Sequence, residues 1–548
     1  MRAPSTQRGS SSAVSFLMRL LGAGLCSLHA FRPPLAWSLL TVCDCGLPSA
    51  LAATLIFFMQ AGFAMLEAGI VHPKNSTNIL FKNMIDAALA ALIFWLVGYG
   101  VAYGPTGGSD GFIGTYNFAI GIDGASNIKN GGGAIAAEGK CVGGWCGGPR
   151  AFSDGWEMWF IQWAFAAKSV SIVAGSVAER TRPRAYFIYS CVFTMLIYPV
   201  VAHWVWGQGF LSPWGARPDA DGKTRPIFST TSDSNGVIDF AGCGVVHMVG
   251  GFTGLVGAIV VGPRTGRFMD GKVNDLYSGN KTLQALGTFI LWFGWYGFNA
   301  GSTLGLQGNL ANVAGKIVVN TTMAGSVAGV VVTFFSRWYL GHYDISMGLN
   351  GVLAGLVSIT ASCQVVEPWH AIIIGTVAAI LLFFGSILLQ KLRIDDPCDA
   401  CIVHGVVGTW GLWAVGIFCI DSNVQYAAYP NTNTACKSGE QFGVQIVGSL
   451  AIFAWTVGTS AIMFLAIKYT VGLRITAEAE DMGLDASEHG IAWDNTEDDL
   501  SKPPPSQPAH PLQPAMMAQA PMGVQMTQQP QFSFVPQNGF PPNGFQNF

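Results

Sequence analysis

Two histidines lie in segments that otherwise suit an apolar environment. The first segment, DFAGCGVVHMVGGFTGL, runs from Asp239 to Leu255, and the second, DACIVHGVVGTWGL, runs from Asp399 to Leu412. A neutral imidazole donates one hydrogen bond and accepts another, and its ordinary pKa of about 6.5 lets it relay a proton. Ionisable side chains are costly inside a membrane and mark pathways there. The two segments therefore predict the movement of a proton or a small polar solute.

Both His247 and His404 open the pattern H-x-x-x-G-x-x-G-L. Positions i, i+4 and i+7 of a helix share one face, so each histidine tops a stripe of small residues that another helix can approach closely. A single histidine could instead be a core residue that hydrogen-bonds a backbone group. Two histidines at matching positions of a repeat favour the pathway.

A carboxylate precedes each histidine. Eight residues separate Asp239 from His247, and eight residues turn a helix by about 800°, which leaves the two side chains about 80° apart around the axis. Asp239 is therefore expected to cap free N–H groups at the start of its helix and to support the site electrostatically. Asp399, at the start of the second segment, is interpreted in the same way. Direct contact of Asp239 with a ligand is the alternative.

The composition is typical of an integral membrane protein. Of the 548 residues, 51% are hydrophobic and only 11% are charged, whereas soluble domains carry about 25% charged residues. The net charge of −3 does not indicate a nucleic-acid partner. No paired CxxC zinc pattern and no nucleotide-phosphate loop occurs in the sequence, so no metal and no cofactor is expected. A disulfide could form in the polar loops that hold Cys141, Cys146 and Cys436, although its pairing does not follow from the sequence.

Eleven apolar segments are long enough to cross a bilayer, since a helix crosses its hydrocarbon core in about 20 residues. They cover residues 47–71, 80–103, 156–178, 185–206, 239–262, 283–304, 313–336, 345–362, 368–390, 398–420 and 441–468. The basic loops at 179–184, 263–281 and 390–396 all fall on one side, which is predicted to be cytoplasmic. The N-terminus is then outside the cell and the C-terminus inside.

Five helices per repeat is an odd number, so the second repeat must run in the opposite direction to the first. The predicted fold class is an all-α membrane protein with two inverted five-helix repeats and an eleventh helix. Transport sites in such folds form near the bilayer midplane, at the interface of the two halves. Both histidines are expected at that depth.

The two ends of the chain differ from the membrane domain, which is predicted over residues 47–475. Residues 1–46 form an N-terminal extension, and residues 14–31 resemble a weak signal sequence interrupted by Arg19. A tail without influence on the fold is the alternative. Residues 476–498 are predicted to be a cytoplasmic regulatory tail. Residues 499–548 are rich in Pro, Gln and Asn and are predicted to be disordered.

Six motifs, taken together and in order, resemble the ammonium transporter family, in particular its eukaryotic and plant-type branch. They are GFAMLEAG (Gly62–Gly69), QWAFAA (Gln162–Ala167), VAERTR, DFAGCGVVH, FGWYGFNAGST (Phe293–Thr303) and DDPCDACIVHGVVGTWG, and the resemblance covers about residues 47–493. It implies a homotrimer in the plasma membrane, in which each subunit has its own narrow pore. It also implies transport of ammonium or ammonia rather than an enzymatic reaction.

The resemblance assigns roles to residues at matching positions. Trp206 and Ser302 would form the outer ammonium site, and Asp239 would support it. Phe165 and Phe298 would form a stacked phenyl gate. In the predicted topology Trp206 and Ser302 lie at the outer ends of their helices, and Phe298 lies one turn deeper. The alternatives are a tryptophan of the interfacial belt and ordinary core aromatics.

His247 and His404 would be the paired pore histidines. Ammonium is a cation that donates four hydrogen bonds, so an indole face can attract it by about 0.5–2 kcal/mol and a hydroxyl can accept from it. Moving the intact charge to the midplane costs from about 3 to more than 10 kcal/mol. Release of the proton at the mouth lowers that barrier, and neutral NH₃ can then enter an apolar pore. Whether the proton passes through the histidines is left open, and net ammonium transport is favoured.

Lys168 departs from the family pattern, which has a small or apolar residue at this position. It lies three residues from Phe165 and within about 60° of the same helix face. A fixed cation beside the pore would repel ammonium. Pairing with Asp86 or Glu67, an orientation away from the pore and a neutral amine are the alternatives.

The segment GLDASEHGIAW (Gly483–Trp493) matches the family's tail motif, which couples the subunits of a trimer. Ser487 falls where related transporters carry a regulatory hydroxyl, so a kinase is an expected partner; an ordinary capping serine is the alternative.

The alternative function is an ammonium sensor of the same fold with slow or no transport. A Rh-type gas channel ranks lower because that branch lacks the Trp206 and Ser302 pair. An intramembrane hydrolase would need a Ser–His dyad, whereas Ser302 lies at the mouth and the histidines lie deeper.

Overall fold

The computed structural model describes residues 46–104, 112–115, 118–119, 156–207, 209–213, 217–218, 224–225, 236–274, 276, 279–306, 308–427, 429, 436 and 439–491. The predictions for residues 1–45 and 499–548 and for Cys141 and Cys146 lie outside these ranges.

The described part is helical apart from a short antiparallel ribbon of β1 (Arg217–Pro218) and β2 (Thr224–Arg225). The α-helices are α3 (Gly46–Ile70), α4 (Ser76–Ile93), α5 (Tyr99–Tyr103), α7 (Trp156–Ser176), α8 (Pro183–Val192), α9 (Tyr198–Val205), α10 (Val249–Val261), α11 (Lys281–Ala300), α12 (Leu310–Leu340), α13 (Ile345–Ile359), α14 (Pro368–Lys391), α15 (Val407–Phe418), α16 (Asp421–Tyr426), α18 (Glu440–Thr470), α19 (Ala477–Met482) and α20 (Leu484–His489). Two 3₁₀ turns are η1 (Pro73–Asn75) and η6 (Gly301–Thr303), and four π-helical segments are η2 (Phe94–Gly98), η4 (Phe193–Ile197), η5 (Cys243–Met248) and η7 (Cys401–Val406).

Eight helical segments in the described ranges are long and apolar enough to cross a membrane. They include the continuous runs Pro73–Tyr103, Pro183–Val205, Cys243–Val261 and Cys401–Phe418, each of which contains one π-helical segment. The other three predicted segments are also helical, as α7, α11 and the shorter α13. Each predicted apolar segment therefore contains a helix.

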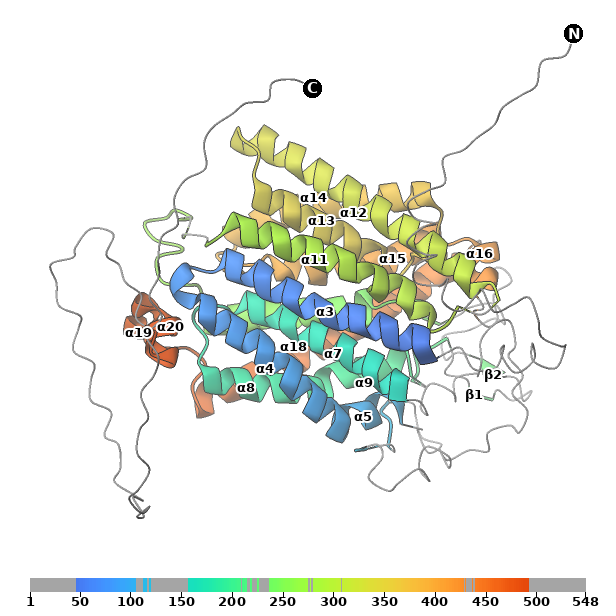
Figure 1. The fold of residues 1–548 in the computed structure, drawn as a ribbon, viewed down its shortest axis with the longest axis horizontal. Helices are drawn as coiled ribbons and strands as arrows, with labels where there is room; N and C mark the ends of the chain where they lie inside the picture. Colours follow the sequence, from blue (N-terminus) through green and yellow to red (C-terminus); the bar gives the residue numbers. More distant parts are fainter. Residues whose placement is uncertain are drawn as a thin grey trace, which may run out of the picture. The chain divides into compact units, whose positions relative to one another are not determined.

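The long helices run side by side (Figure 1). α3 packs against α11 and α7, and α12, α13 and α14 form a second group. α10 packs against α7, α18 and η7. Because η5 also contacts η7, the two histidine segments meet inside the helical body.

Polar side chains at the loop boundaries fix where several helices begin. The Asn280 side chain accepts hydrogen bonds from the N–H groups of Thr282 and Leu283 at the start of α11. Asp344 accepts from Met347 N at the start of α13. These side chains satisfy N–H groups that have no partner within the first turn of a helix.

The three loops that the sequence predicts on one side meet at one end of the helices. Arg264 forms an ion pair with Glu179, and its guanidinium donates to the two carboxylate oxygens of Asp395 at 2.8 and 2.9 Å. Arg180 donates to the backbone oxygen of Asp395 at 2.6 Å. Their meeting agrees with the predicted alternation of the helices that connect them.

We expect Asp395→Asn to destabilise the protein at neutral pH. Burial by itself would raise the pKa of Asp395, but hydrogen bonds and charge from Arg264 outweigh burial and hold that pKa at about 2, below the ordinary 3.8. The stabilisation, about 2 kcal/mol, is then complete above pH 4 and is lost as the pH falls toward 2. Thermal unfolding of the purified variant should show a loss at pH 7 that shrinks at pH 3.

Asp270→Asn is the matched control, because Asp270 is exposed in the same group of loops. It should leave the unfolding temperature unchanged at both values of pH. An equal loss for Asp395→Asn at pH 7 and pH 3 would show that its effect does not depend on the charge of the carboxylate.

The C-terminal helix α20 packs at the start of α4, and α19 packs against α20. The Asp485 carboxylate accepts hydrogen bonds from Thr77 N at 2.9 Å and from Asn78 N at 2.7 Å. Asn75, which precedes α4, accepts from Leu484 N at 2.8 Å. The tail therefore supplies the N-terminal cap of a helix that begins more than 400 residues earlier in the chain.

Candidate functional site

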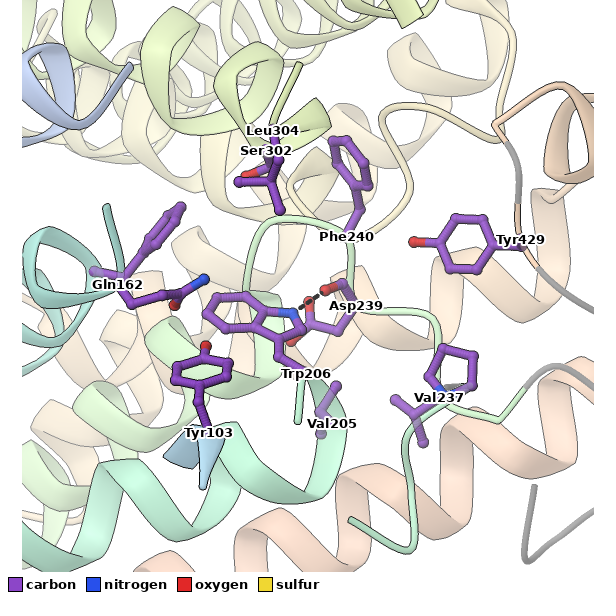
Figure 2. A pocket seen from close by; sticks show the side chains of 12 residues that line it. Tyr103, Gln162, Val205, Trp206, Val237, Asp239, Phe240, Ser302, Leu304 and Tyr429 are labelled. Atoms are coloured by element: carbon purple, nitrogen blue, oxygen red, sulfur yellow. Dashed lines mark hydrogen bonds between the residues drawn. The ribbon is translucent and has the colours of Figure 1, made fainter. Parts of the chain in front are cut away.

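A cavity of about 60 Å³ opens beside Trp206 (Figure 2). Trp206 follows the end of α9, whereas the basic loop 179–184 precedes α8, so the cavity lies at the other end of this span. Its lining is mixed, with aromatic rings on several sides and a few polar groups among them: Tyr103, Gln162, Phe165, Val205, Trp206, Pro213, Val237, Asp239, Phe240, Ser302, Leu304 and Tyr429. The cavity has room for a few water-sized molecules. Four predicted outer-site and gate residues, Phe165, Trp206, Asp239 and Ser302, therefore line one small space.

Backbone contacts fix the orientation of the indole and the hydroxyl in this cavity. Trp206 Nε1 donates to the backbone oxygen of Asp239 at 2.6 Å. Ser302 Oγ donates to the backbone oxygen of Phe298 at 2.8 Å, which leaves the lone pairs of the hydroxyl free to accept. A cation at this position would meet an aromatic ring and a hydrogen-bond acceptor.

Asp239 acts as a cap at the start of η5. One carboxylate oxygen accepts from Gly242 N at 3.1 Å, and the other accepts from Gly244 N and Val245 N, both at 2.9 Å. The backbone turns sharply at Gly242, whose φ of +107° is unfavourable for residues with a side chain beyond hydrogen. The predicted capping contacts of Asp239 are therefore present.

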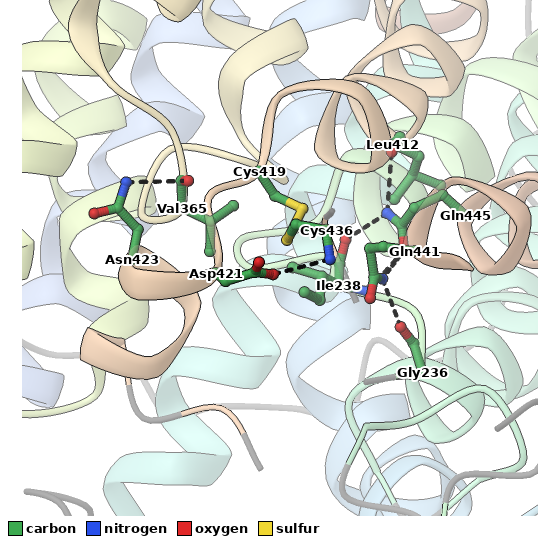
Figure 3. Close-up of a disulfide and its surroundings, with 10 residues drawn as sticks. All are labelled: Gly236, Ile238, Val365, Leu412, Cys419, Asp421, Asn423, Cys436, Gln441 and Gln445. Carbon is green, nitrogen blue, oxygen red and sulfur yellow. Dashed lines mark hydrogen bonds between the residues drawn. A yellow bond between two sulfur atoms is a disulfide. The ribbon is translucent and has the colours of Figure 1, made fainter. Parts of the chain in front are cut away.

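Two glutamines of α18 hold the loop that carries Asp239 (Figure 3). Gln445 accepts from Ile238 N at 2.9 Å and donates to the backbone oxygens of Ile238 and Leu412. Gln441 donates to the backbone oxygen of Gly236 at 2.8 Å. The loop beside Trp206 is thus tied both to α18 and to the second histidine helix.

A disulfide lies close to the same glutamines. Cys419, at the end of α15, is bonded to Cys436, and Asp421 accepts from Cys436 N at 3.0 Å. The sequence singled out Cys436 as a disulfide candidate without a partner, and the structure supplies Cys419. The bond joins the end of the second histidine helix to the segment that leads into α18 (Figure 3).

Phe165 and Phe298 lie between the outer cavity and the histidines. Their ring centroids are 4.7 Å apart, and the ring planes meet at 82°. The prediction of stacked rings is therefore wrong: the pair is edge-to-face, an arrangement that places the positive edge of one ring on the negative face of the other. Phe165 also contacts Trp206, with centroids 5.3 Å apart.

His247 and His404 are in direct contact. Their Nδ1 atoms are 3.2 Å apart, and their rings are 5.2 Å apart and nearly parallel at 17°. His247 also stacks on Trp295, with ring centroids 5.3 Å apart and ring planes at 11°. Both histidines are buried, with exposed fractions of 2% and 5%. The aromatic neighbours fix the rings, so neither can turn away from the other without repacking.

An Nδ1–Nδ1 hydrogen bond constrains the protons of the pair. One Nδ1 must donate and the other must accept, so in the neutral pair the two Nε2 atoms are in opposite states, one bearing hydrogen and one free to accept. The Nε2 of His247 has no hydrogen-bond partner among the described residues. The pair can therefore accept a proton at one end and release another at the far end.

Glycines of both stripes lie where the histidine helices cross. A methyl group added at Gly251 would overlap the backbone nitrogen of Gly405 and lie 2.9 Å from the carbonyl carbon of His404. A methyl group at Gly408 would lie 2.7 Å from the backbone oxygen of Cys243. The close helix approach that the repeat predicts is present, and it brings the two imidazoles together.

Asp396, and not Asp399, makes the capping contacts of the second repeat. Asp396 accepts from Cys401 N at 2.7 Å and from Ser176 Oγ at 3.1 Å. Asp399 has a positive φ of 53°, and its carboxylate lies 3.5 Å from the Asn350 amide. The interpretation of Asp399 as the cap is therefore corrected. Asp396 precedes His404 by eight residues, the same spacing as that of Asp239 and His247.

Lys168 faces α3 and lines neither the outer cavity nor the second cavity described below. Its ammonium group donates to Gln60 Oε1 and lies 5.9 Å from the centre of the Phe57 ring. Asp86 is instead hydrogen-bonded to Tyr186 and Ser190. Of the alternatives considered for Lys168, the structure shows an orientation away from the cavities.

In the described ranges no group of three or more His, Cys, Asp or Glu side chains is arranged to hold a metal ion. The deciding comparison is a family model, the Ammonium Transporter Family, which matches residues 49–492. The chain belongs to the ammonium transporter family. The family predicted from the motifs is thus confirmed, and with it the membership of a group of membrane transporters.

Individual members of the family are similar over most of this chain. Ammonium transporter 1 member 3 of Solanum lycopersicum is 40% identical over 469 residues, which are 82% of this chain and 92% of that protein. Ammonium transporter Amt2 of Archaeoglobus fulgidus is 37% identical over 80% of this chain and 86% of its own. Among solved structures, a "Sensor Amt Protein" superimposes with a TM-score of 0.68 at 32% identity, over 82% of this chain and 99% of that chain.

Proposed function

We propose that this ammonium transporter family member binds NH₄⁺ in the outer cavity, removes a proton from it and conducts NH₃ past the two histidines. The observation that carries the proposal is the 3.2 Å contact between the Nδ1 atoms of His247 and His404. It lies between the outer cavity, on one side, and a second cavity lined by His404, on the other.

Recruitment of the cation rests on Trp206 and Ser302. The indole face attracts a cation, and the Ser302 hydroxyl accepts one of its four hydrogen bonds. Asp239 supports this site through the loop that it caps, and Phe165 and Phe298 act as the gate that separates it from the histidines. The attraction is modest, so the ion is gathered without being trapped, as conduction requires.

The histidine pair relays the proton in a balanced step. A proton binds the free Nε2 of one imidazole, the Nδ1 proton of that ring moves to the Nδ1 of the other ring, and the second ring releases its own Nε2 proton. Both rings are neutral again, with exchanged tautomers. Before the next proton can follow, both tautomers must be restored, which requires the two rings to turn over with repacking of their neighbours; the net result of the cycle is electrogenic ammonium transport.

The proposed assembly is a homotrimer in the plasma membrane with one pore in each subunit. All eleven apolar segments cross the bilayer as two inverted five-helix repeats and an eleventh helix, with the N-terminus outside and the C-terminus in the cytoplasm. The meeting of the basic loops at the end of the helices away from Trp206 supports this orientation. Residues 47–475 form the membrane domain, and residues 476–498 form the regulatory tail.

His247→Ala should lower ammonium-evoked current at least tenfold, which corresponds to about 1.4 kcal/mol. Without the imidazole, a proton released in the outer cavity has no acceptor next to His404. The measurement is whole-cell current and ammonium uptake in cells that lack their own ammonium transporters. His342→Ala is the matched control, because His342 is exposed between α12 and α13. A current unchanged by His247→Ala would argue against the relay.

The same cells separate transport from sensing. A sensor of the same fold is the second candidate, favoured by the likeness to the solved sensor Amt protein. Growth on limiting ammonium and a measurable uptake by the wild-type chain support a transporter. Binding of ammonium to the purified protein together with no uptake would identify a sensor.

We further propose that a kinase regulates the tail through Ser487, which is exposed on α20 and donates to the backbone oxygen of Gly483 at 2.9 Å. A phosphate adds about −1.5 to −2 charges two residues from Asp485, whose carboxylate caps α4. The added negative charge disfavours the docked tail. Ser487→Asp should change ammonium uptake at least twofold relative to Ser487→Ala in the same assay, and equal uptake by the two variants would count against this role.

A further inference from the structure

A second cavity, of about 20 Å³, lies on the other side of the histidine pair. It has room for a single water-sized molecule. Its lining is apolar apart from a few groups: Phe63, Leu66, Glu67, Ile172, Gly175, Asn350, Leu353, Cys398, Ala400, Val403 and His404. We call it the inner cavity. It places one carboxylate and one pore histidine around the same small volume.

Glu67 on α3 is the charged group of the inner cavity, and it is 97% buried. One of its oxygens, Oε2, accepts from Asn83 Nδ2 at 2.6 Å. Asn83 is itself fixed, because it also donates to the backbone oxygen of Ile79 and accepts from Gln60 at 3.2 Å. The carboxylate is therefore held in one orientation by side chains of α3 and α4.

The second oxygen of Glu67, Oε1, points to the side of the cavity formed by α7 and the loop before η7. A methyl group added at Gly175 would lie 3.1 Å from Oε1 and 2.9 Å from Cys398 Sγ. Both Gly175 and Cys398 line the cavity. The glycine thus leaves open the space that a ligand of Oε1 would occupy.

The charged side chains near Glu67 do not line the cavity, so a cation can enter it. Lys82 and Asp86 on α4 interact with the carboxylate electrostatically. Neither lines the cavity: the Lys82 ammonium lies over the Tyr186 ring at 5.2 Å, and Asp86 bonds to α8. The Cys398 thiol lines the cavity, and Asp399 lies outside the lining, 3.5 Å from the Asn350 amide. A buried carboxylate in an otherwise apolar cavity of this size favours a small cation with N–H donors.

We propose that Glu67 forms an inner ammonium site, at which NH₄⁺ is held after it is re-formed beneath His404. This rests on the proposed function, because the relay delivers the proton. The N–H bond at Nε2 of the His404 imidazolium breaks, a new N–H bond forms on NH₃, and His404 becomes neutral. The resulting NH₄⁺ donates to Glu67 Oε1 before it leaves for the cytoplasmic side.

The experiment measures ammonium currents of the full-length protein in oriented liposomes, with ammonium chloride added to either face. Glu67→Gln keeps the size of the side chain and removes its charge. It should raise the half-saturating ammonium concentration about tenfold when ammonium is added at the inner face and leave the value at the outer face unchanged. Trp206→Leu should raise the half-saturating concentration for ammonium added at the outer face and leave the value at the inner face unchanged. Glu478→Gln, at an exposed carboxylate of α19, should change neither.

A second measurement needs no transport. Ammonium chloride, compared with choline chloride, should raise the unfolding temperature of the purified protein, because a ligand that binds the folded state stabilises it. Trp206→Leu should retain part of this protection, and the double variant Trp206→Leu/Glu67→Gln should lose it. The double variant Trp206→Leu/Gly175→Ala keeps the Glu67 charge but fills the cavity, and it should also lose the protection by ammonium chloride.

The outcomes separate the two proposals. A wild-type protein without current refutes electrogenic transport, and protection that depends on Glu67 still establishes the inner site. Currents in which Glu67→Gln shifts both faces equally, or neither, overturn the inner site and leave the proposed function intact. Protection that persists in the double variant overturns it as well.

Discussion

Gly251→Ala is expected to prevent the protein from reaching its folded state in the membrane. The added methyl group would overlap the backbone nitrogen of Gly405, and a backbone atom cannot move aside as the end of a side chain can. Overpacking inside a dense core costs about 1–3 kcal/mol and occasionally more, and this contact lies at the crossing that holds both imidazoles. The measurement is the yield of monodisperse protein in detergent, together with ammonium uptake at matched surface expression.

Gly315→Ala is the matched control for that substitution. A methyl group at Gly315, on α12, meets no atom within 4 Å. Because alanine is favoured over glycine in a helix by about 0.5–1 kcal/mol, this variant should be at least as stable as the wild type. Equal yields and equal uptake for the two alanine variants would show that the helices at Gly251 can separate without harm.

Asp239→Ala is expected to cost at least 3 kcal/mol of stability, about 1–3 kcal/mol for each buried donor left without a partner. Three N–H groups, those of Gly242, Gly244 and Val245, lose their acceptor together. Asp239→Asn keeps one acceptor oxygen and should lose about half as much. The measurement is the unfolding temperature of the purified variants, with ammonium uptake measured in parallel.

This series also separates a cap from a ligand. If Asp239 supports the site only through its loop, uptake should fall in proportion to the loss of stability, so that Asp239→Asn falls between the wild type and Asp239→Ala. If the carboxylate binds ammonium directly, Asp239→Asn should keep most of the stability and lose affinity for ammonium as completely as Asp239→Ala.

The helical segments and the meeting of the two histidines could be predicted from the sequence because each has a periodic signature. Apolar runs of sufficient length predicted a helix at every one of the eleven positions, and H-x-x-x-G-x-x-G predicted a face that a second helix can approach. His247 and His404 are far apart in sequence, yet each carries its own stripe, so the contact follows from local patterns on both sides.

The sequence contains the signal for the cap of the second repeat, although the edge of the apolar run points to Asp399 and the cap is Asp396. Three aspartates, Asp395, Asp396 and Asp399, precede His404, and Asp399 is the one at the edge of the apolar run. The eight-residue spacing shared by Asp239–His247 and Asp396–His404 identifies the second of the three. The spacing matters because each carboxylate must reach N–H groups at the start of its π-helical segment.

Other features of the site depend on contacts that no local pattern encodes. Whether Phe165 and Phe298 stack or meet edge to face is decided by the packing of α7 against α11. Lys168 faces α3 because Gln60, more than 100 residues earlier, supplies an acceptor there. Cys419 lies at the end of an apolar segment, where a cysteine is most simply a small core residue, and its bond to Cys436 depends on the path of the intervening loop.

The cap that Asp485 provides for α4 has a consequence for biosynthesis. The two partners are separated by 408 residues, and translation proceeds at about 5–20 residues per second, so α4 is made roughly 20–80 s before its cap. During that interval the amides of Thr77 and Asn78 have to be satisfied by water or by the insertion machinery. The first turn of α4 is therefore among the last parts of the molecule to mature, because it can close only after Asp485 has been made.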